Sequence, residues 1–200
     1  MNGKYLFCVI LFFFSGSSDA QIQKYSWQAG LSVAPLFELN SSGLNGKLFN
    51  LHGEYSFSNR FILGIQPYYA CTNEKMIYAY DLIHEEPKEI QKDVFYSFGA
   101  NVELKFILKD NIKFKPYSSV IFGVGHSRYH IYHNNVFGQL EPQDRGYFYN
   151  YNLGIGLGAY FFLNEKWYLD AKMMYTDVSA SKDIESSSYL YPSVGIIKVF

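Results

Sequence analysis

Residues 147–161 read Tyr-Phe-Tyr-Asn-Tyr-Asn-Leu-Gly-Ile-Gly-Leu-Gly-Ala-Tyr-Phe, and every odd position is apolar or aromatic. The even positions carry mainly asparagine and glycine, so the two sets of side chains would project from opposite faces of a strand. On the apolar face, tyrosines begin the series and a phenylalanine ends it, with aliphatic residues between. This order is typical of a strand that crosses a bilayer, because aromatic girdles meet the headgroups and aliphatic side chains meet the hydrocarbon.

The length of this segment fits a membrane as well. From Tyr151 to Phe161 the strand would be about 34 Å long. A tilt near 45° projects it to about 24 Å, close to the ~25 Å apolar band of an outer-membrane barrel. Past residue 20 no apolar stretch approaches the length of a membrane-spanning helix, which excludes a helical membrane protein. The net charge of -1 gives no reason to expect a nucleic-acid partner.

Alternation of this kind recurs along the chain and predicts eight strands. They cover residues 24–34, 47–57, 60–72, 94–108, 114–129, 147–161, 167–176 and 189–200. Short turns of Asn, Asp and Ser type (58–59, 110–112 and 164–166) alternate with long connections (35–46, 73–93, 131–146 and 177–188). We therefore expect a closed eight-stranded antiparallel up-and-down transmembrane β-barrel, with the short turns and both termini in the periplasm.

The first twenty residues have the features of an export signal. Lys4 precedes an apolar run over residues 5–14, and small residues follow up to Ala20. The run is too short for a spanning helix and fits a signal-peptide core. We expect residues 1–20 to be cleaved and residues 21–200 to form one barrel domain. Cys71 would then be the single remaining cysteine, which excludes an intramolecular disulfide. A lipid anchor would need a cysteine just after the cleavage point, and Cys8 lies inside the apolar run, so we expect none.

With eight predicted strands and an aromatic residue at the C-terminus, residues 21–200 resemble the OmpA and OmpX type of outer-membrane barrel. The chain ends Val194-Gly195-Ile196-Ile197-Lys198-Val199-Phe200, similar to the C-terminal signal that the barrel-assembly machinery reads. Val194, Ile196 and Phe200 fit that pattern, whereas Lys198 takes a position that is usually apolar. The resemblance implies residence in the outer membrane of a Gram-negative bacterium, among its lipids and lipopolysaccharide.

Charged residues on the predicted inward face balance, three acids against three bases. They are Glu54, Glu103, Asp170, Lys105, Lys115 and Lys172. Eight strands leave an interior only wide enough for side chains to fill, and an unpaired charge there would be costly. We interpret the set as a network that plugs the lumen. The alternative that the residues leave open is a gated ion path along these charges.

Candidate catalytic and metal groups do not converge in the predicted strands. His126, His130 and His133 could suggest a metal site, but His126 and His130 would lie about 13 Å apart on one strand, too far to share an ion. His126 and Ser127 could suggest a lipid deacylase, but adjacent strand residues face opposite sides. We therefore expect no metal, no cofactor and no catalysis.

The segment from Asn73 to Asp93 is the longest and most charged of the predicted loops. Exposed loops carry binding function, so it could contact an extracellular partner, and the alternative is a solvated hairpin extension. The sequence predicts a monomeric barrel with a structural or surface-interaction role. The alternative function is a lipid-A-modifying or other membrane-embedded hydrolase, and the rival fold is a soluble lipocalin-like barrel, which would carry its apolar face inside.

Overall fold

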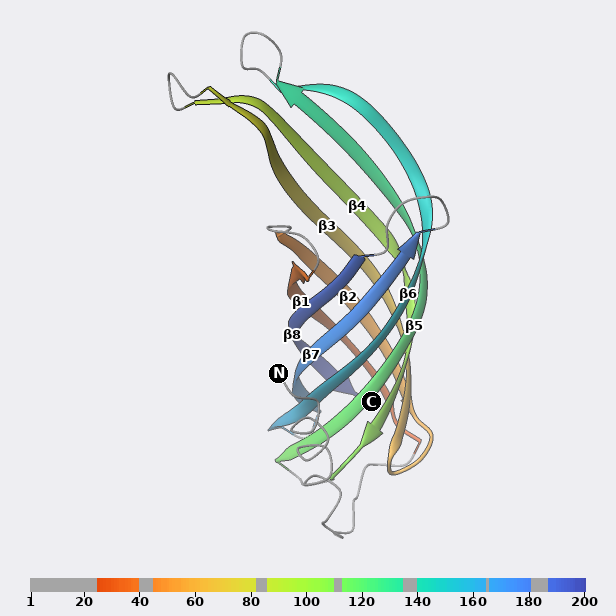
Figure 1. Ribbon diagram of the computed structural model, residues 1–200. Coiled ribbons are helices and arrows are strands. Elements are labelled where there is room, and N and C mark those ends of the chain that lie inside the picture. Colours follow the sequence, from red (N-terminus) through yellow and green to blue (C-terminus); the bar gives the residue numbers. More distant parts are fainter. Residues whose placement is uncertain are drawn as a thin grey trace, which may run out of the picture.

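The computed structural model describes residues 25–39, 45–81, 86–109, 113–134, 140–164, 166–180 and 187–200. They form eight antiparallel strands in one closed barrel, in which each strand pairs with its neighbours in sequence and β8 pairs with β1 (Figure 1). The strands are β1 Trp27–Glu38, β2 Asn45–Ser56, β3 Phe61–Asp81, β4 Glu86–Ile107, β5 Phe114–Asn134, β6 Leu140–Asn164, β7 Trp167–Ala180 and β8 Ser187–Val199. Among the described residues no helix could cross a membrane. The predicted fold is confirmed.

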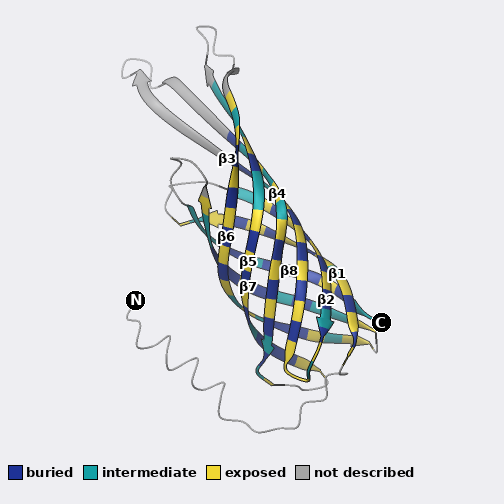
Figure 2. Cartoon of the chain, turned by 90° about the vertical axis from the view of Figure 1, so that its right-hand side faces the viewer, coloured by how far each residue is buried: buried dark blue, intermediate teal, exposed yellow. Residues whose placement is uncertain are grey.

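Burial alternates along the strands in the predicted sense. On β6, Leu153, Ile155 and Leu157 are more than half exposed, while Asn150 and Asn152 are buried. The same two-residue period runs round the barrel wall (Figure 2). Because large apolar side chains cover the outside and polar groups lie inside, the lipocalin-like alternative is wrong.

The structure corrects the predicted bounds of the strands on either side of residues 73–93. The predicted strand bounds at residues 72 and 94 were too short: β3 continues to Asp81 and β4 starts at Glu86, so most of the 73–93 segment is a strand hairpin, as the hairpin-extension alternative expected. The same holds for 131–146, where β5 and β6 continue the ladder to Asn134 and Leu140. The predicted bounds relied on apolar alternation, whereas backbone pairing between antiparallel strands can continue without it.

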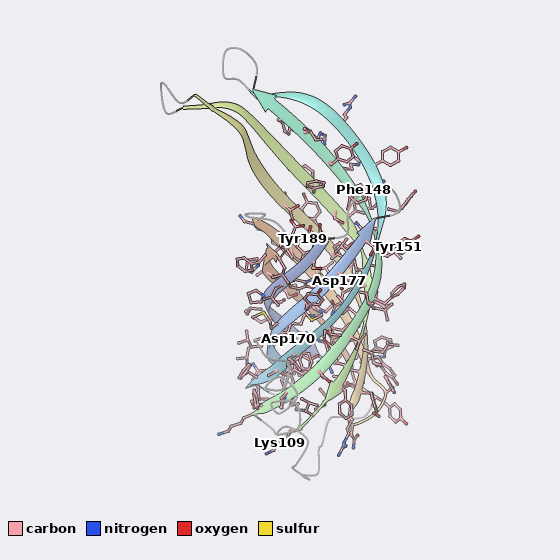
Figure 3. The ribbon with its side chains drawn as sticks, viewed as in Figure 1. Lys109, Phe148, Tyr151, Asp170, Asp177 and Tyr189 are labelled. Carbon is pink, nitrogen blue, oxygen red and sulfur yellow. The ribbon has the colours of Figure 1, made fainter. Side chains whose placement is uncertain are left out.

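Four strands therefore extend beyond the barrel as a protruding sheet, made of β3 beyond Asn73, β4 before Asp93, β5 beyond Arg128 and β6 before Asn150. The β2–β3 pairing ends at Asn45 and Asn73, and the β6–β7 pairing ends at Asn150 and Ala180. Figure 1 shows both long hairpins rising on the same side of the barrel. At the other end, Lys109 marks the short turns (Figure 3).

The seam between β1 and β8 is interrupted. Ladder pairs run from Gln28–Val199 to Val33–Val194 and resume at Phe37–Leu190 in the same register. That register places Pro35 opposite Pro192 in the interruption. Neither proline has an N–H to donate, so a ladder hydrogen bond cannot form from either side.

Candidate functional site

The structure places all six predicted luminal charges inside the barrel. None of their residues is more than 8% exposed, and Glu54 and Glu103 are completely buried. Asp170 lies in the lower half of the barrel in Figure 3. Lys115 is buried as well, and its Nζ lies 5.5 Å from the centre of the Tyr168 ring. The residues come from β2, β4, β5 and β7 and face inward because each occupies the inward parity of its strand.

Lys105 is the centre of the charged group. Its Nζ lies 2.7 Å from Glu54 Oε1, 3.4 Å from Asp170 Oδ2 and 3.6 Å from Glu103 Oε2. Lys172 Nζ donates to both oxygens of Glu103 at 3.1 Å. One ammonium thus contacts three carboxylates, and a second ammonium contacts one of them, which compensates buried charge that would otherwise be costly.

Two tyrosines complete the hydrogen bonding of these acids. Tyr160 Oη donates to Glu54 Oε2 at 2.8 Å and accepts from Lys105 Nζ at 2.6 Å, while Tyr117 Oη donates to Asp170 Oδ1 at 2.5 Å. Lys105 Nζ also lies 4.8 Å from the centres of both rings, which is cation–π distance. The tyrosines were not among the predicted site residues, although their inward parity on β5 and β6 could have indicated them.

Apolar clusters lie on both sides of the charged group along the strands. The cluster nearer the short turns contains Ile62, Ile107, Tyr117, Tyr160 and Ile197. The cluster nearer the long hairpins contains Ala34, Leu36, Leu48, Tyr68, Ile121, Met174 and Tyr191. The charged side chains therefore have apolar neighbours above and below, which strengthens the electrostatic interactions between them.

Glycines on the inward face of β6 make room for these large side chains. A Cβ at Gly158 would lie 2.5 Å from Cζ of Tyr117, and a Cβ at Gly156 would overlap Sδ of Met174. The glycine run that marks β6 in the sequence thus allows aromatic and thioether groups of neighbouring strands to lie flat against it.

An amide network lies toward the long hairpins. Asn152 Nδ2 donates to Asn101 Oδ1 at 3.0 Å and to Tyr68 Oη at 2.9 Å. Tyr68 Oη also donates to Asn150 Oδ1 at 3.2 Å, and Asn150 Nδ2 donates to Ser127 Oγ at 2.5 Å. Side chains of β3, β4, β5 and β6 thereby meet across the interior.

A serine, a histidine and a carboxylate also converge in the lumen. Ser32 Oγ lies 2.7 Å from His52 Nε2, and His52 Nδ1 lies 3.4 Å from Glu54 Oε1. This is the order of groups in a hydrolytic triad, but His52 Nδ1 makes no hydrogen bond and all three residues are less than 5% exposed. Such a group cannot meet a substrate in this conformation. The sequence analysis did not identify it, because His52 and Ser32 lie on different strands and their contact depends on register.

The same corner offers the ligand atoms that could hold a metal ion. Ligand atoms of His52, Glu54 and Glu103 lie within 4.8 Å of one another. However, Lys105 Nζ already lies against both carboxylates. A divalent ion would have to displace an ammonium that supplies positive charge at the same place, so the donor set fits a metal poorly.

His126 and His130 lie on the outer face of β5. The His126 ring lies 5.3 Å from Phe98 and 5.4 Å from Tyr149, both exposed on the outside, whereas the adjacent Ser127 is buried in the lumen. The structure thus separates His126 and Ser127 onto opposite faces. The side chain of His133 lies outside the described residues.

The residues of the C-terminal pattern share the outer face of β8. Val194 and Ile196 are about half exposed, and Phe200 is the most exposed at 69%. Lys198, which departs from the pattern, extends its Nζ to 4.8 Å from the Phe200 ring centre and 5.8 Å from that of Trp167. The lysine stem can follow the apolar wall while the ammonium stays at the interface.

Comparison with known proteins supports the architecture. A family model described as "Outer membrane protein beta-barrel domain" matches residues 6–190. No curated protein gives a match in sequence. Among solved structures, Neisserial surface protein A has a TM-score of 0.51 at 17% identity, covering 88% of this chain and 97% of that one.

Two further solved structures are similar at lower scores. Ail, the attachment invasion locus protein of Yersinia pestis, has a TM-score of 0.46 at 19% identity and covers 89% of this chain and 100% of its own. The N-terminal barrel of OprF from Pseudomonas aeruginosa has a TM-score of 0.42 at 10% identity, with coverage of 86% and 97%.

Proposed function

Because the chain belongs to the outer membrane protein β-barrel family, we propose that it is a surface-interaction protein that presents its protruding sheet outside the cell. In this proposal residues 1–20 direct export and are removed. The barrel-assembly machinery then inserts residues 21–200 as a monomer into the outer membrane of a Gram-negative cell.

The observation that carries the proposal is the unequal length of the strands. β3 continues to Asp81 although its pairing with β2 ends at Asn73, and β6 begins at Leu140 although its pairing with β7 begins at Asn150. In the described part of the chain these two stretches pair on one side only. A strand edge of this kind can take up an extended segment of another protein through main-chain hydrogen bonds.

A closed lumen is part of the same proposal. Ion pairs, tyrosines and an amide network connect strands across the interior, and apolar clusters lie on both sides of the charges. These contacts support a scaffold whose interior is filled, which leaves the outside as the working surface.

The test shortens the protruding sheet while the barrel is retained. Residues 75–92 and 131–144 are each replaced by an Asn-Gly turn, and an epitope tag is inserted at Asn59 for detection at the periplasmic end. Photo-crosslinking on intact cells should yield a surface partner with the full chain and lose it with the shortened chain. Equal crosslinking by both chains would reject the protruding sheet as the binding surface.

A second candidate function, hydrolysis, is favoured by the Ser32–His52–Glu54 contacts. It has a direct test, because a fluorophosphonate probe reacts with an activated serine. We expect no labelling of the folded barrel, since Ser32 is 2% exposed and faces the lumen. Labelling that disappears in a Ser32→Ala variant would make the hydrolase the better assignment.

A further inference from the structure

On the outer surface of β4, β5 and β6, successive ladder rows change from apolar to aromatic and then to positively charged side chains toward the long hairpins. One ladder row is aliphatic or aromatic, with Val102, Phe122 and Leu153 side by side. Two rows farther out, Phe98, His126 and Tyr149 are neighbours. The sequence of rows follows a bilayer from hydrocarbon to headgroup, as interfacial aromatic residues require.

The next two rows introduce positive charge. Arg128 is flanked by Tyr96 and Tyr147 on the neighbouring strands, and His130 is paired with Arg145. Both arginines are exposed. We call the outward set on β5 and β6 the β5–β6 patch, consisting of His126, Arg128, His130, Arg145, Tyr147 and Tyr149.

Ring packing holds this patch in shape. His126 stacks on Tyr147 with centroids 5.5 Å apart, and Tyr149 approaches the same histidine edge-on at 5.4 Å. His130 lies 6.1 Å from Tyr96. The arginines therefore stand beside packed rings on paired strands, which limits the entropy lost when they order around a ligand.

Charge on the outer surface is distributed unevenly. On β7, the strand after β6, the outward residue near the long hairpins is Asp177, which accepts hydrogen bonds from Tyr175 at 2.7 Å and Ser188 at 2.6 Å. Figure 3 places Asp177 in the upper half of the barrel. Asp177 pairs with Leu153 in the aliphatic row, whereas the ladder partners of Arg128 are Tyr96 and Tyr147, so this carboxylate lies several rows away from the arginines.

We propose that the β5–β6 patch binds the phosphate group of a lipid in the outer leaflet. The guanidinium fork matches phosphate geometry, and two arginines on paired strands can share one phosphate or contact two. The tyrosines belong at the headgroup level, and the aliphatic row below them would contact the acyl chains. A soluble anion would use the arginines but gain nothing from that apolar row.

The test measures lipid retained by the full mature barrel in phosphatidylcholine nanodiscs. The discs contain lipid A with its phosphates or the same lipid A after dephosphorylation, and native mass spectrometry counts bound molecules. We expect the phosphorylated form to be retained preferentially, and the Arg128→Gln/Arg145→Gln variant to lose about fivefold for each arginine removed. If the double variant lacks heat-dependent gel mobility, the single variant Arg128→Gln replaces it.

Lys47→Gln is the matched control. Lys47 is exposed and lies in the same ladder row as Cys71, Tyr96 and Arg128, but on β2, outside the patch. Retention by this variant should stay within twofold of the unmodified barrel. Equal retention of both lipids, an equal loss in the Lys47 variant, or displacement of the lipid by free inorganic phosphate would each overturn the proposal.

Discussion

Lys105 Nζ lies 2.7 Å from Glu54 Oε1, although the two residues belong to β4 and β2 and are separated by the whole of β3. Their contact therefore spans part of the lumen rather than one ladder. Asp170 on β7 meets the same ammonium from another part of the wall. Removing this one group should affect several strands together.

We expect Lys105→Met to lower the free energy of unfolding by about 3 to 5 kcal/mol, because three buried carboxylates lose a shared partner. Urea unfolding of the barrel from lipid vesicles measures the effect. Lys47→Met, which changes an exposed lysine, should stay within about 0.5 kcal/mol of the unmodified protein. A Lys105 variant as stable as this control would show that the acids are solvated or protonated instead of paired.

Two glycines allow a test of packing in the lumen. Gly158→Ala would place a Cβ 2.5 Å from Cζ of Tyr117 and 2.7 Å from Cβ of Lys172, and the overpacking should cost about 1 to 3 kcal/mol. At Gly53, the nearest atom to an added Cβ is 4.0 Å away, so Gly53→Ala should cost nothing. Equal unfolding midpoints for the two variants would mean that the luminal side chains near Gly158 rearrange at little cost to accommodate the added methyl group.

The outward face of β6 can be tested with arginine. Leu157 is 53% exposed near the middle of the apolar band, and Leu157→Arg should cost about 2 to 4 kcal/mol on folding into vesicles. Tyr147→Arg, on the same face but at its outer end, should cost about 0 to 1 kcal/mol. A larger loss at position 147 would place the hydrocarbon elsewhere on the strand.

Planar-bilayer recordings test whether the interior is closed. The unmodified barrel should give no steady ion current, because Tyr117, Tyr160 and Lys105 pack together inside the lumen and Lys105 also contacts Glu54 on β2. A Tyr117→Ala/Tyr160→Ala variant should conduct measurably if it still folds. A stable conductance in the unmodified protein would favour the gated ion path instead.

Export can be followed by mass spectrometry of the protein from outer-membrane fractions. The mature chain should begin at Gln21, and unheated samples should migrate differently from heated ones, since a closed barrel resists detergent. Recovery in the soluble periplasm with the same mobility in both samples would contradict insertion in the membrane.

The two-residue period was enough to predict the faces, because in a barrel each side chain must point either to lipid or to the lumen. Parity alone placed Glu54, Glu103 and Lys105 inside. It could not predict that Lys105 meets Glu54, since contacts across the lumen depend on strand tilt and stagger, which local alternation does not encode. For the same reason the contact between Ser32 and His52 appears only when β1 and β2 are in register.

The bounds of the strands that form the protruding sheet were predicted too short for a different reason. The predicted strand bounds relied on apolar alternation, which gives way to a charged stretch of sequence beyond Asn73. The pairing of this part of β3 with β4 is carried by the backbone and includes a register shift near Ile77. A charged stretch of sequence can therefore resemble a loop even where a ladder forms.

The opposed prolines on β1 and β8 have a consequence for how the cylinder is completed. β1 and β8 are the first and last strands of the barrel in the sequence, and their pairing closes the wall. Pro35 and Pro192 divide the β1–β8 pairing into two ladder segments, one from Gln28 to Val33 and one at Phe37 and Glu38. The longer segment lies toward the short turns, and the short one toward the long hairpins is the part of the wall that opens with the least loss of hydrogen bonds.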